Sequence, residues 1–125
     1  RNARLLLAED DPVNREVELV LLEDIGWTID TAEDGQQALD LAAVNDYQLI
    51  LMDMQMPVMN GLEATRAIRK LPNRQHVPIL AMTANAFAED REACLEAGMN
   101  DFLTKPVVPE KLFEVLLKWL TRKSA

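Results

Sequence analysis

The stretch Leu49-Ile50-Leu51-Met52-Asp53 decides the fold class of this sequence. Four consecutive apolar side chains are typical of a strand in the middle of a parallel sheet, where helices cover both faces. A similar run, Leu5-Leu6-Leu7-Ala8, lies near the N-terminus and is followed by two acids, Glu9 and Asp10. Two short apolar runs that end in carboxylates predict two buried parallel strands whose ends meet at one edge of a sheet.

Amphipathic segments separate these runs from three further short strands. We predict these strands at Trp27–Thr31, Val77–Met82 and Asp101–Thr104, and the first of them alternates apolar and polar residues, which is typical of a sheet edge. The predicted helices run from Asp11 to a stop at Gly26, from Asp34-Gly35 through Ala42, from Asn60 through Leu71, from about Ala86 to Ala97, and from near Pro109 onward. Strict alternation with right-handed crossovers predicts a doubly wound α/β sheet with helices on both faces.

Helical spacing also predicts which side chains are buried. In the first helix the expected inner face consists of Val13, Val17, Val20 and Leu21. In the last helix it consists of Leu112, Val115, Leu116 and Trp119. A second apolar edge of the last helix is either further core or a docking face for a partner, including a second copy of the chain: Phe113, Leu117 and Leu120.

The composition limits the class of protein. The chain has 125 residues, enough for one domain spanning 1–125, and its 49% hydrophobic and 27% charged residues are typical of a globular protein. A net charge of −8 argues against nucleic-acid binding, because phosphate backbones are bound by clustered basic residues. The single cysteine, Cys94, excludes an internal disulfide and fits a reducing compartment.

No apolar run approaches the roughly 20 residues that span a bilayer, and the N-terminus lacks a signal-peptide pattern. We therefore expect a cytoplasmic domain without membrane contact. Because the chain begins with Arg1 rather than Met, we also expect it to be a segment of a longer protein.

Polar residues follow four of the predicted strands at the edge where parallel sheets bind ligands. They are Glu9 and Asp10 after the first strand, Asp53 after the third, Thr83 after the fourth and Lys105 after the fifth. Three carboxylates on neighbouring strands repel one another unless a cation lies between them, and oxygen ligands without Cys or His favour Mg²⁺. The lysine and the hydroxyl are suited to phosphoryl oxygens.

Five motifs together resemble the receiver domain of two-component response regulators over essentially the whole chain. In order they are Glu9-Asp10, residues 51–57 (Leu-Met-Asp-Met-Gln-Met-Pro), Asn60-Gly61, Met82-Thr83-Ala84 and Thr104-Lys105-Pro106. The finer pattern at 82–86 and 98–102 resembles receivers fused to hybrid sensor histidine kinases, whose parent proteins are often membrane-anchored. The resemblance implies a flavodoxin-like five-stranded parallel sheet with strand order 2-1-3-4-5.

The same resemblance implies a site and a function. Asp53 would accept a phosphoryl group from a phosphohistidine on a histidine kinase or a histidine phosphotransfer domain. Mg²⁺, or Mn²⁺ in its place, would be held by Glu9, Asp10, Asp53 and the backbone carbonyl of Gln55. Lys105 would pair with the phosphoryl group. The domain would then switch a protein-interaction surface rather than turn over a free metabolite, so it is not an enzyme in isolation.

Further residues have roles implied by the family pattern. Thr83 would be the switch hydroxyl and Phe102 the switch aromatic, which lacks the hydroxyl of the more usual Tyr. Gln55 and Asn85 would flank the path of the attacking water and tune dephosphorylation. The Lys105–Pro106 peptide bond would be cis. Glu9 stands where Asp is more usual, so its arm is longer.

Three alternatives are weighed against this interpretation. A phosphatase of the haloacid dehalogenase type also forms an aspartyl phosphate, but it places a second Asp two residues after the first, where this chain has Pro12. The glycines form neither a Walker loop nor a dinucleotide fingerprint, which disfavours a nucleotide-binding module. A phosphate-independent interaction domain would be favoured if Asp53 or Lys105 were missing.

Asp11 is interpreted as a helix cap rather than a ligand.

Overall fold

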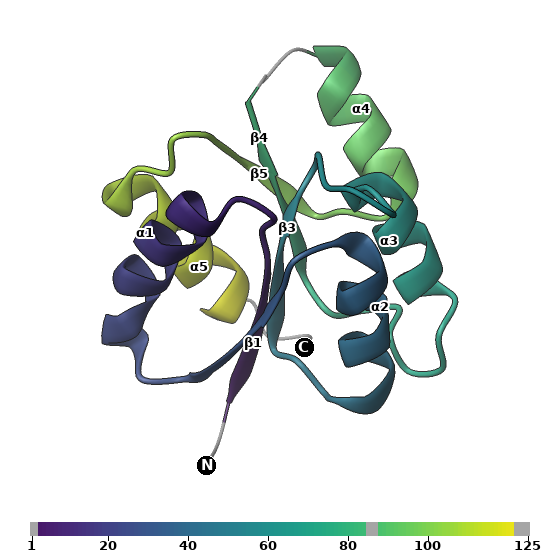
Figure 1. Cartoon of the computed structure of the whole chain (residues 1–125), viewed down its shortest axis with the longest axis horizontal. Coiled ribbons are helices and arrows are strands. Elements are labelled where there is room, and N and C mark those ends of the chain that lie inside the picture. Colours follow the sequence, from purple (N-terminus) through teal and green to yellow (C-terminus); the bar gives the residue numbers. More distant parts are fainter. Residues whose placement is uncertain (1–2, 85–87, 122–125) are drawn as a thin grey trace.

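A computed structural model describes residues 3–84 and 88–121 (Figure 1). Its elements, in chain order, are β1 (Arg4–Ala8), α1 (Pro12–Leu22), a short 3₁₀ helix η1 (Glu23–Ile25), β2 (Thr28–Ala32), α2 (Gly35–Val44), β3 (Leu49–Asp53), α3 (Gly61–Arg69), β4 (Ile79–Thr83), α4 (Ala88–Ala97), β5 (Asp101–Thr104) and α5 (Pro109–Thr121).

Within the described ranges, the five strands form one parallel sheet in the order β2-β1-β3-β4-β5. Figure 1 shows α1 and α5 on one face of the sheet and α2, α3 and α4 on the other. Each face has its own apolar core: Leu22, Leu112 and Leu116 pack with sheet residues on the first, and Ile68 and Cys94 on the second. The predicted flavodoxin-like fold and strand order are confirmed.

Local sequence signals begin and end several of these helices as predicted. The Asp11 side chain accepts hydrogen bonds from the backbone N–H groups of Val13 and Asn14 at 2.8 and 3.3 Å, and Pro12 occupies the first helical position, where no N–H is needed. At α3, Asn60 and Glu63 form a reciprocal capping box with two bonds of 2.9 Å. Gly26 ends η1 with a positive φ of 73°.

The predicted inner face of the first helix is wrong in most positions. Val13, Val17 and Val20 are 71%, 52% and 60% exposed, whereas Glu18 and Leu22 are buried. Only Leu21, of the predicted set, packs partly against the core. The helix turns its leucines to the sheet instead of its valines, since burying the larger side chains removes more apolar area from water.

The predicted inner face of the last helix is confirmed, with Leu112 and Leu116 buried and Val115 and Trp119 packed beside them. The second apolar edge is divided. Its last member, Leu120, packs against the core, whereas Phe113 and Leu117 are 39% and 64% exposed.

Smaller differences concern boundaries. β2 begins and ends one residue later than predicted. β4 begins at Ile79 rather than Val77, because Pro78 has no N–H to donate to the sheet. α3 ends at Arg69, two residues before the predicted Leu71. The predicted start of the fourth helix, Ala86, lies outside the described residues.

The Lys105–Pro106 peptide bond is cis, as predicted. None of the helices in the described ranges is long and apolar enough to span a membrane.

Candidate functional site

The carboxyl ends of β1, β3, β4 and β5 open into one cleft. Its lining includes Asp10, Asp53, Thr83 and Lys105, each from a different strand end, together with residues from the first turn of α1 and from the loop after β3. The sheet topology brings together residues that are up to 95 positions apart in the sequence, since all strands are parallel and end at the same edge.

The carboxylates of Asp10 and Asp53 line the cleft, and the carboxylate of Glu9 lies beside them. One oxygen from each lies within 4.8 Å of the others. Glu9 is fully buried and Asp53 nearly so, while Asp10 is exposed to the cleft. Burial is the main factor that raises the pKa of Asp53 and of Asp10, and neighbouring acids raise both further.

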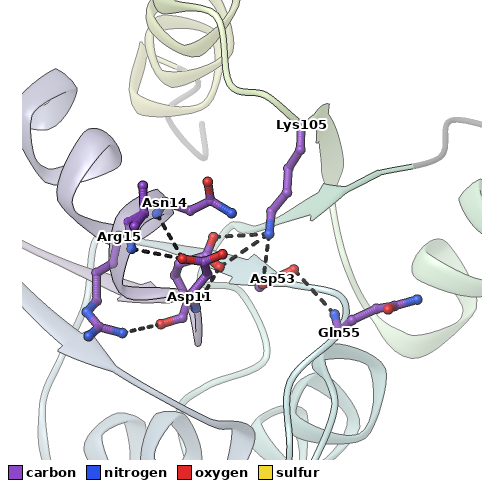
Figure 2. A network of polar contacts seen from close by, with 8 residues as sticks. Asp11, Asn14, Arg15, Asp53, Gln55 and Lys105 are labelled. Atoms are coloured by element: carbon purple, nitrogen blue, oxygen red, sulfur yellow. Dashed lines mark hydrogen bonds and ion pairs between the residues drawn. The ribbon is translucent and has the colours of Figure 1, made fainter.

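Lys105 crosses the cleft to these carboxylates (Figure 2). Its Nζ lies 2.9 Å from Asp53 Oδ2, and 3.2 and 3.3 Å from the two carboxylate oxygens of Glu9. Burial by itself would lower the pKa of Lys105, but the hydrogen bonds and negative charges of Asp53 and Glu9 outweigh burial and raise it. One ammonium thus faces three carboxylates.

The donor set fits a divalent cation. Glu9 Oε1 is buried and, although 3.2 Å from Lys105 Nζ, has no partner in hydrogen-bond geometry among the described residues. A buried carboxylate oxygen without a hydrogen bond, beside two further carboxylates and no Cys or His ligand, suits Mg²⁺ or Mn²⁺.

The loop after β3 packs closely against the end of the strand at Asp53. The backbone N–H of Gln55 donates to Asp53 Oδ1 at 3.3 Å, while its side chain extends away from Asp53 (Figure 2). A Cβ on Gly61 would lie 2.3 Å from the carbonyl oxygen of Asp53, so only glycine allows α3 to begin this close to the strand end.

Three predicted site residues remain to be placed: Thr83, Phe102 and Asn85. Thr83 is buried at the end of β4 and lines the cleft. Phe102 lies on β5 next to β4, paired with Ala81 in the register, and the guanidinium of Arg91 lies 4.9 Å from the centre of its ring. Asn85 lies outside the described residues.

Two residues next to the site, Glu18 and Asn14, were not predicted from the sequence. Glu18 is 4% exposed, and its carboxyl faces Glu9; burial, followed by the hydrogen bond and charge of Glu9, raises the pKa of Glu18 to about 9. Asn14 lines the cleft. Both lie on the line of α1 that faces the sheet. The sequence pattern that could have placed them there is the i, i+4 spacing of Asn14, Glu18 and Leu22, but the three valines of the same helix favoured a different inner face.

The sequence profile of the response regulator receiver domain matches residues 5–117. This chain is a response regulator receiver domain. That membership decides against the phosphatase alternative, and a receiver domain is not itself a catalytic enzyme domain.

The receiver domain is similar to parts of much longer kinases. It is 43% identical over 120 residues to the hybrid signal transduction histidine kinase I of Dictyostelium discoideum, covering 90% of this chain and 7% of that protein. It spans between 7% and 14% of the length of the first curated relatives it matches.

Solved structures resemble the receiver domain over nearly its whole length. The receiver domain of the sensor histidine kinase PA1611 from Pseudomonas aeruginosa is 44% identical, with a TM-score of 0.89 and coverage of 96% of this chain and 98% of that one; it has a magnesium ion coordinated in its active-site cleft. The receiver domain of Ssk1 from Saccharomyces cerevisiae, in complex with the histidine phosphotransfer protein Ypd1, is 30% identical, with a TM-score of 0.86 and coverage of 94% and 88%.

Proposed function

We propose that this receiver domain accepts a phosphoryl group on Asp53 from a phosphohistidine of a partner protein. The observation that carries the proposal is the position of Asp53 at the end of β3, 2.9 Å from the ammonium of Lys105 and beside two further carboxylates. An Asp53 oxygen attacks phosphorus; the new P–O bond forms as the P–N bond to the imidazole breaks, and the imidazole leaves with the electron pair.

The chain's own residues bind and orient the transferred group. Lys105 already lies against Asp53 and can move its charge to a phosphoryl oxygen without leaving the cleft. Mg²⁺ held by Glu9, Asp10, Asp53 and the Gln55 carbonyl would supply charge neutralisation for the oxygens in transfer. The PA1611 receiver, with magnesium in the corresponding cleft, supports this assignment.

The response to phosphorylation involves Thr83 and Phe102. Thr83 lies in the cleft, and its strand is paired with β5, which carries Phe102. The hydroxyl of Thr83 moves toward the phosphoryl group, and the ring of Phe102 follows into the space that is vacated. Gln55 and Asn85 tune the subsequent hydrolysis. Because a carboxamide cannot act as a base near neutral pH, both do so by orienting or obstructing water.

The parent protein is a hybrid histidine kinase, and this domain lies on its cytoplasmic side. The similarity to the receiver parts of hybrid and sensor histidine kinases supports this assignment. The phosphohistidine is therefore on the kinase itself or on a histidine phosphotransfer domain, as in the Ypd1–Ssk1 pair.

The exposed line of α1 is the docking surface for that partner. Val13, Val17 and Val20 lie on one side of the helix at i, i+4 and i+7. The helix begins at the cleft, where Asp11 and Asn14 line it. A partner helix packed along these valines would place its phosphohistidine at the open side of the cleft, and the removal of exposed apolar area from water would stabilise the complex.

Phosphorylation by acetyl phosphate tests the assignment of Asp53. With Mg²⁺ present, the parent domain should gain one phosphoryl group that hydroxylamine removes, and Asp53→Asn should gain none, as measured by intact-protein mass spectrometry. Asp24→Asn, which neutralises an exposed acid of η1, is the matched control and should behave as the parent. If Asp53→Asn is modified as readily as the parent, Asp53 is not the acceptor.

A further inference from the structure

Asn14 is a cleft residue that neither the proposed metal site nor the proposed phosphoryl contacts use. It lies in the first turn of α1 and lines the cleft with Asp10, Asp53 and Lys105. Its backbone N–H donates to Asp11 Oδ1 at 3.3 Å, which anchors this turn. Within the part of the chain that the structure describes, its side-chain carboxamide makes no hydrogen bond.

The position of Asn14 on α1 directs its side chain to the site. Glu18 and Leu22 follow at i+4 and i+8, and they are 4% and 1% exposed, so this line of the helix faces the sheet. At the N-terminal end of that line, Asn14 faces the carboxyl ends of the strands. Figure 2 shows its carboxamide extending from α1 toward the side where Lys105 and Asp53 lie.

The other cleft carboxamides in the described ranges are engaged elsewhere or point away. Asn60 Oδ1 accepts the hydrogen bond of the α3 capping box at 2.9 Å. The side chain of Gln55 extends away from Asp53 (Figure 2). Asn14 is thus the carboxamide among these three that faces the acceptor carboxylate with its donors and its acceptor unoccupied.

We propose that Asn14 positions the water molecule that hydrolyses the phosphoryl group on Asp53, and thereby shortens the lifetime of the phosphorylated state. The proposal rests on the proposed function of Asp53. The carboxamide oxygen accepts a hydrogen bond from the water, and the N–H group can donate to a phosphoryl oxygen, so one side chain can align the water with phosphorus.

The reaction balances without a protein base. The water oxygen forms a bond to phosphorus while the bond between phosphorus and the Asp53 oxygen breaks, and the electron pair returns to the Asp53 carboxylate. The water gives up one proton to solvent, since a carboxamide cannot accept it near neutral pH. The products are inorganic phosphate and the original carboxylate.

The test compares two variants that differ in volume. Asn14→Leu keeps the branched shape with a larger volume and no hydrogen-bonding atoms, and Asn14→Ala removes the carboxamide. Each protein is phosphorylated with acetyl phosphate and Mg²⁺, freed of the donor by rapid desalting, and followed by intact-protein mass spectrometry. Both variants should lose phosphate about 3- to 10-fold more slowly than the parent, the factor expected in a rate for the loss of one hydrogen bond.

The same samples separate this role from a structural one. The melting temperature of both variants should stay close to that of the parent, and Glu16→Gln, an exposed position of the same helix outside the cleft, should hydrolyse at the parent rate. Unchanged hydrolysis in both variants overturns the proposal. Faster hydrolysis in Asn14→Ala also overturns it, because the side chain would then shield the phosphoryl group. A parent that is never phosphorylated contradicts the proposed function instead.

Discussion

Glu18 shows how a single buried residue can be unfavourable for stability beside a functional site. Its carboxyl lies against Glu9, and one of its oxygens, Oε1, has no hydrogen-bond partner in the described part of the chain. Glu9 has the ammonium of Lys105 beside it. Burial, followed by the hydrogen bond and charge of Glu9, raises the pKa of Glu18 to about 9, so Glu18 keeps its proton at neutral pH.

This environment predicts that Glu18→Gln increases the free energy of unfolding by an amount that depends on pH. Because the pKa of Glu18 rises from 4.5 to about 9 on folding, only the unfolded chain releases this proton between those values, and the free energy of unfolding falls as the pH rises through that window. Glutamine does not ionise. In metal-free buffer the variant should be more stable than the parent at pH 7, by an amount on the order of 2 kcal/mol.

Urea unfolding at pH 4 and at pH 8 checks this prediction. The difference between Glu18→Gln and the parent should be small at pH 4 and larger at pH 8. Glu16→Gln, on the exposed side of α1, should change stability by less than about 0.5 kcal/mol at both values. A difference that is the same at both pH values would show that Glu18 is ionised in the folded domain.

At the scale of the element, α1 has apolar side chains on two sides, and these have different uses. Leu22 belongs to the core, while Val13, Val17 and Val20 remain exposed beside the cleft. Solvent-exposed valines in a row along one helix are unfavourable in a free monomer, and they fit a surface that a partner covers.

The docking role predicts that Val17→Glu separates two phosphorylation reactions. Transfer from a phosphorylated histidine phosphotransfer domain that serves the parent should slow about tenfold, because a charge in the centre of an apolar interface costs more than ~1.4 kcal/mol of binding free energy. Phosphorylation by acetyl phosphate should change less than about twofold, since Val17 is outside the cleft.

The matched control is Val44→Glu. Val44 is 76% exposed at the end of α2, on the opposite face of the sheet. It should leave both reactions unchanged. If both variants slow phosphotransfer equally, or if neither slows it, the docking surface does not lie on α1.

At the scale of the whole molecule, an excess of acidic charge is concentrated where the strands end. The domain carries a net charge of −8, and three of its carboxylates converge within 4.8 Å in the cleft. Their mutual repulsion opposes folding, and a bound cation relieves it.

Mg²⁺ should therefore raise the melting temperature of the parent in a concentration-dependent manner, because it binds the folded state and not the unfolded chain. Asp10→Asn should lose most of this increase. In a metal-free buffer the same variant should be at least as stable as the parent, since one of the repelling charges is gone.

Calorimetry in chelator and in a series of Mg²⁺ concentrations measures both effects. Asp24→Asn removes an exposed acid outside the cleft and should show the full parent response. A full response in Asp10→Asn would mean that the cation binds elsewhere.

The sequence by itself determined the order and the kind of the elements, because the relevant signals are local. A run such as residues 49–53 can be satisfied only by burial on both faces, and caps such as Asp11 and Asn60 act through hydrogen bonds within three residues. The strand ends also allow Asp53 and Lys105 to be expected close together, because parallel strands place all their carboxyl ends at one edge.

The tertiary structure alone decided which line of α1 is buried and what lies beside the site. Branched aliphatic side chains lie on both sides of that helix, with leucines at 19, 21 and 22 and valines at 13, 17 and 20, so apolar periodicity does not choose between them. The choice follows from how much area the leucines bury against the sheet, a quantity that exists only once the helix is packed. That one rotation of α1 also brought Asn14 to the cleft and Glu18 against Glu9, and left the valines in solvent.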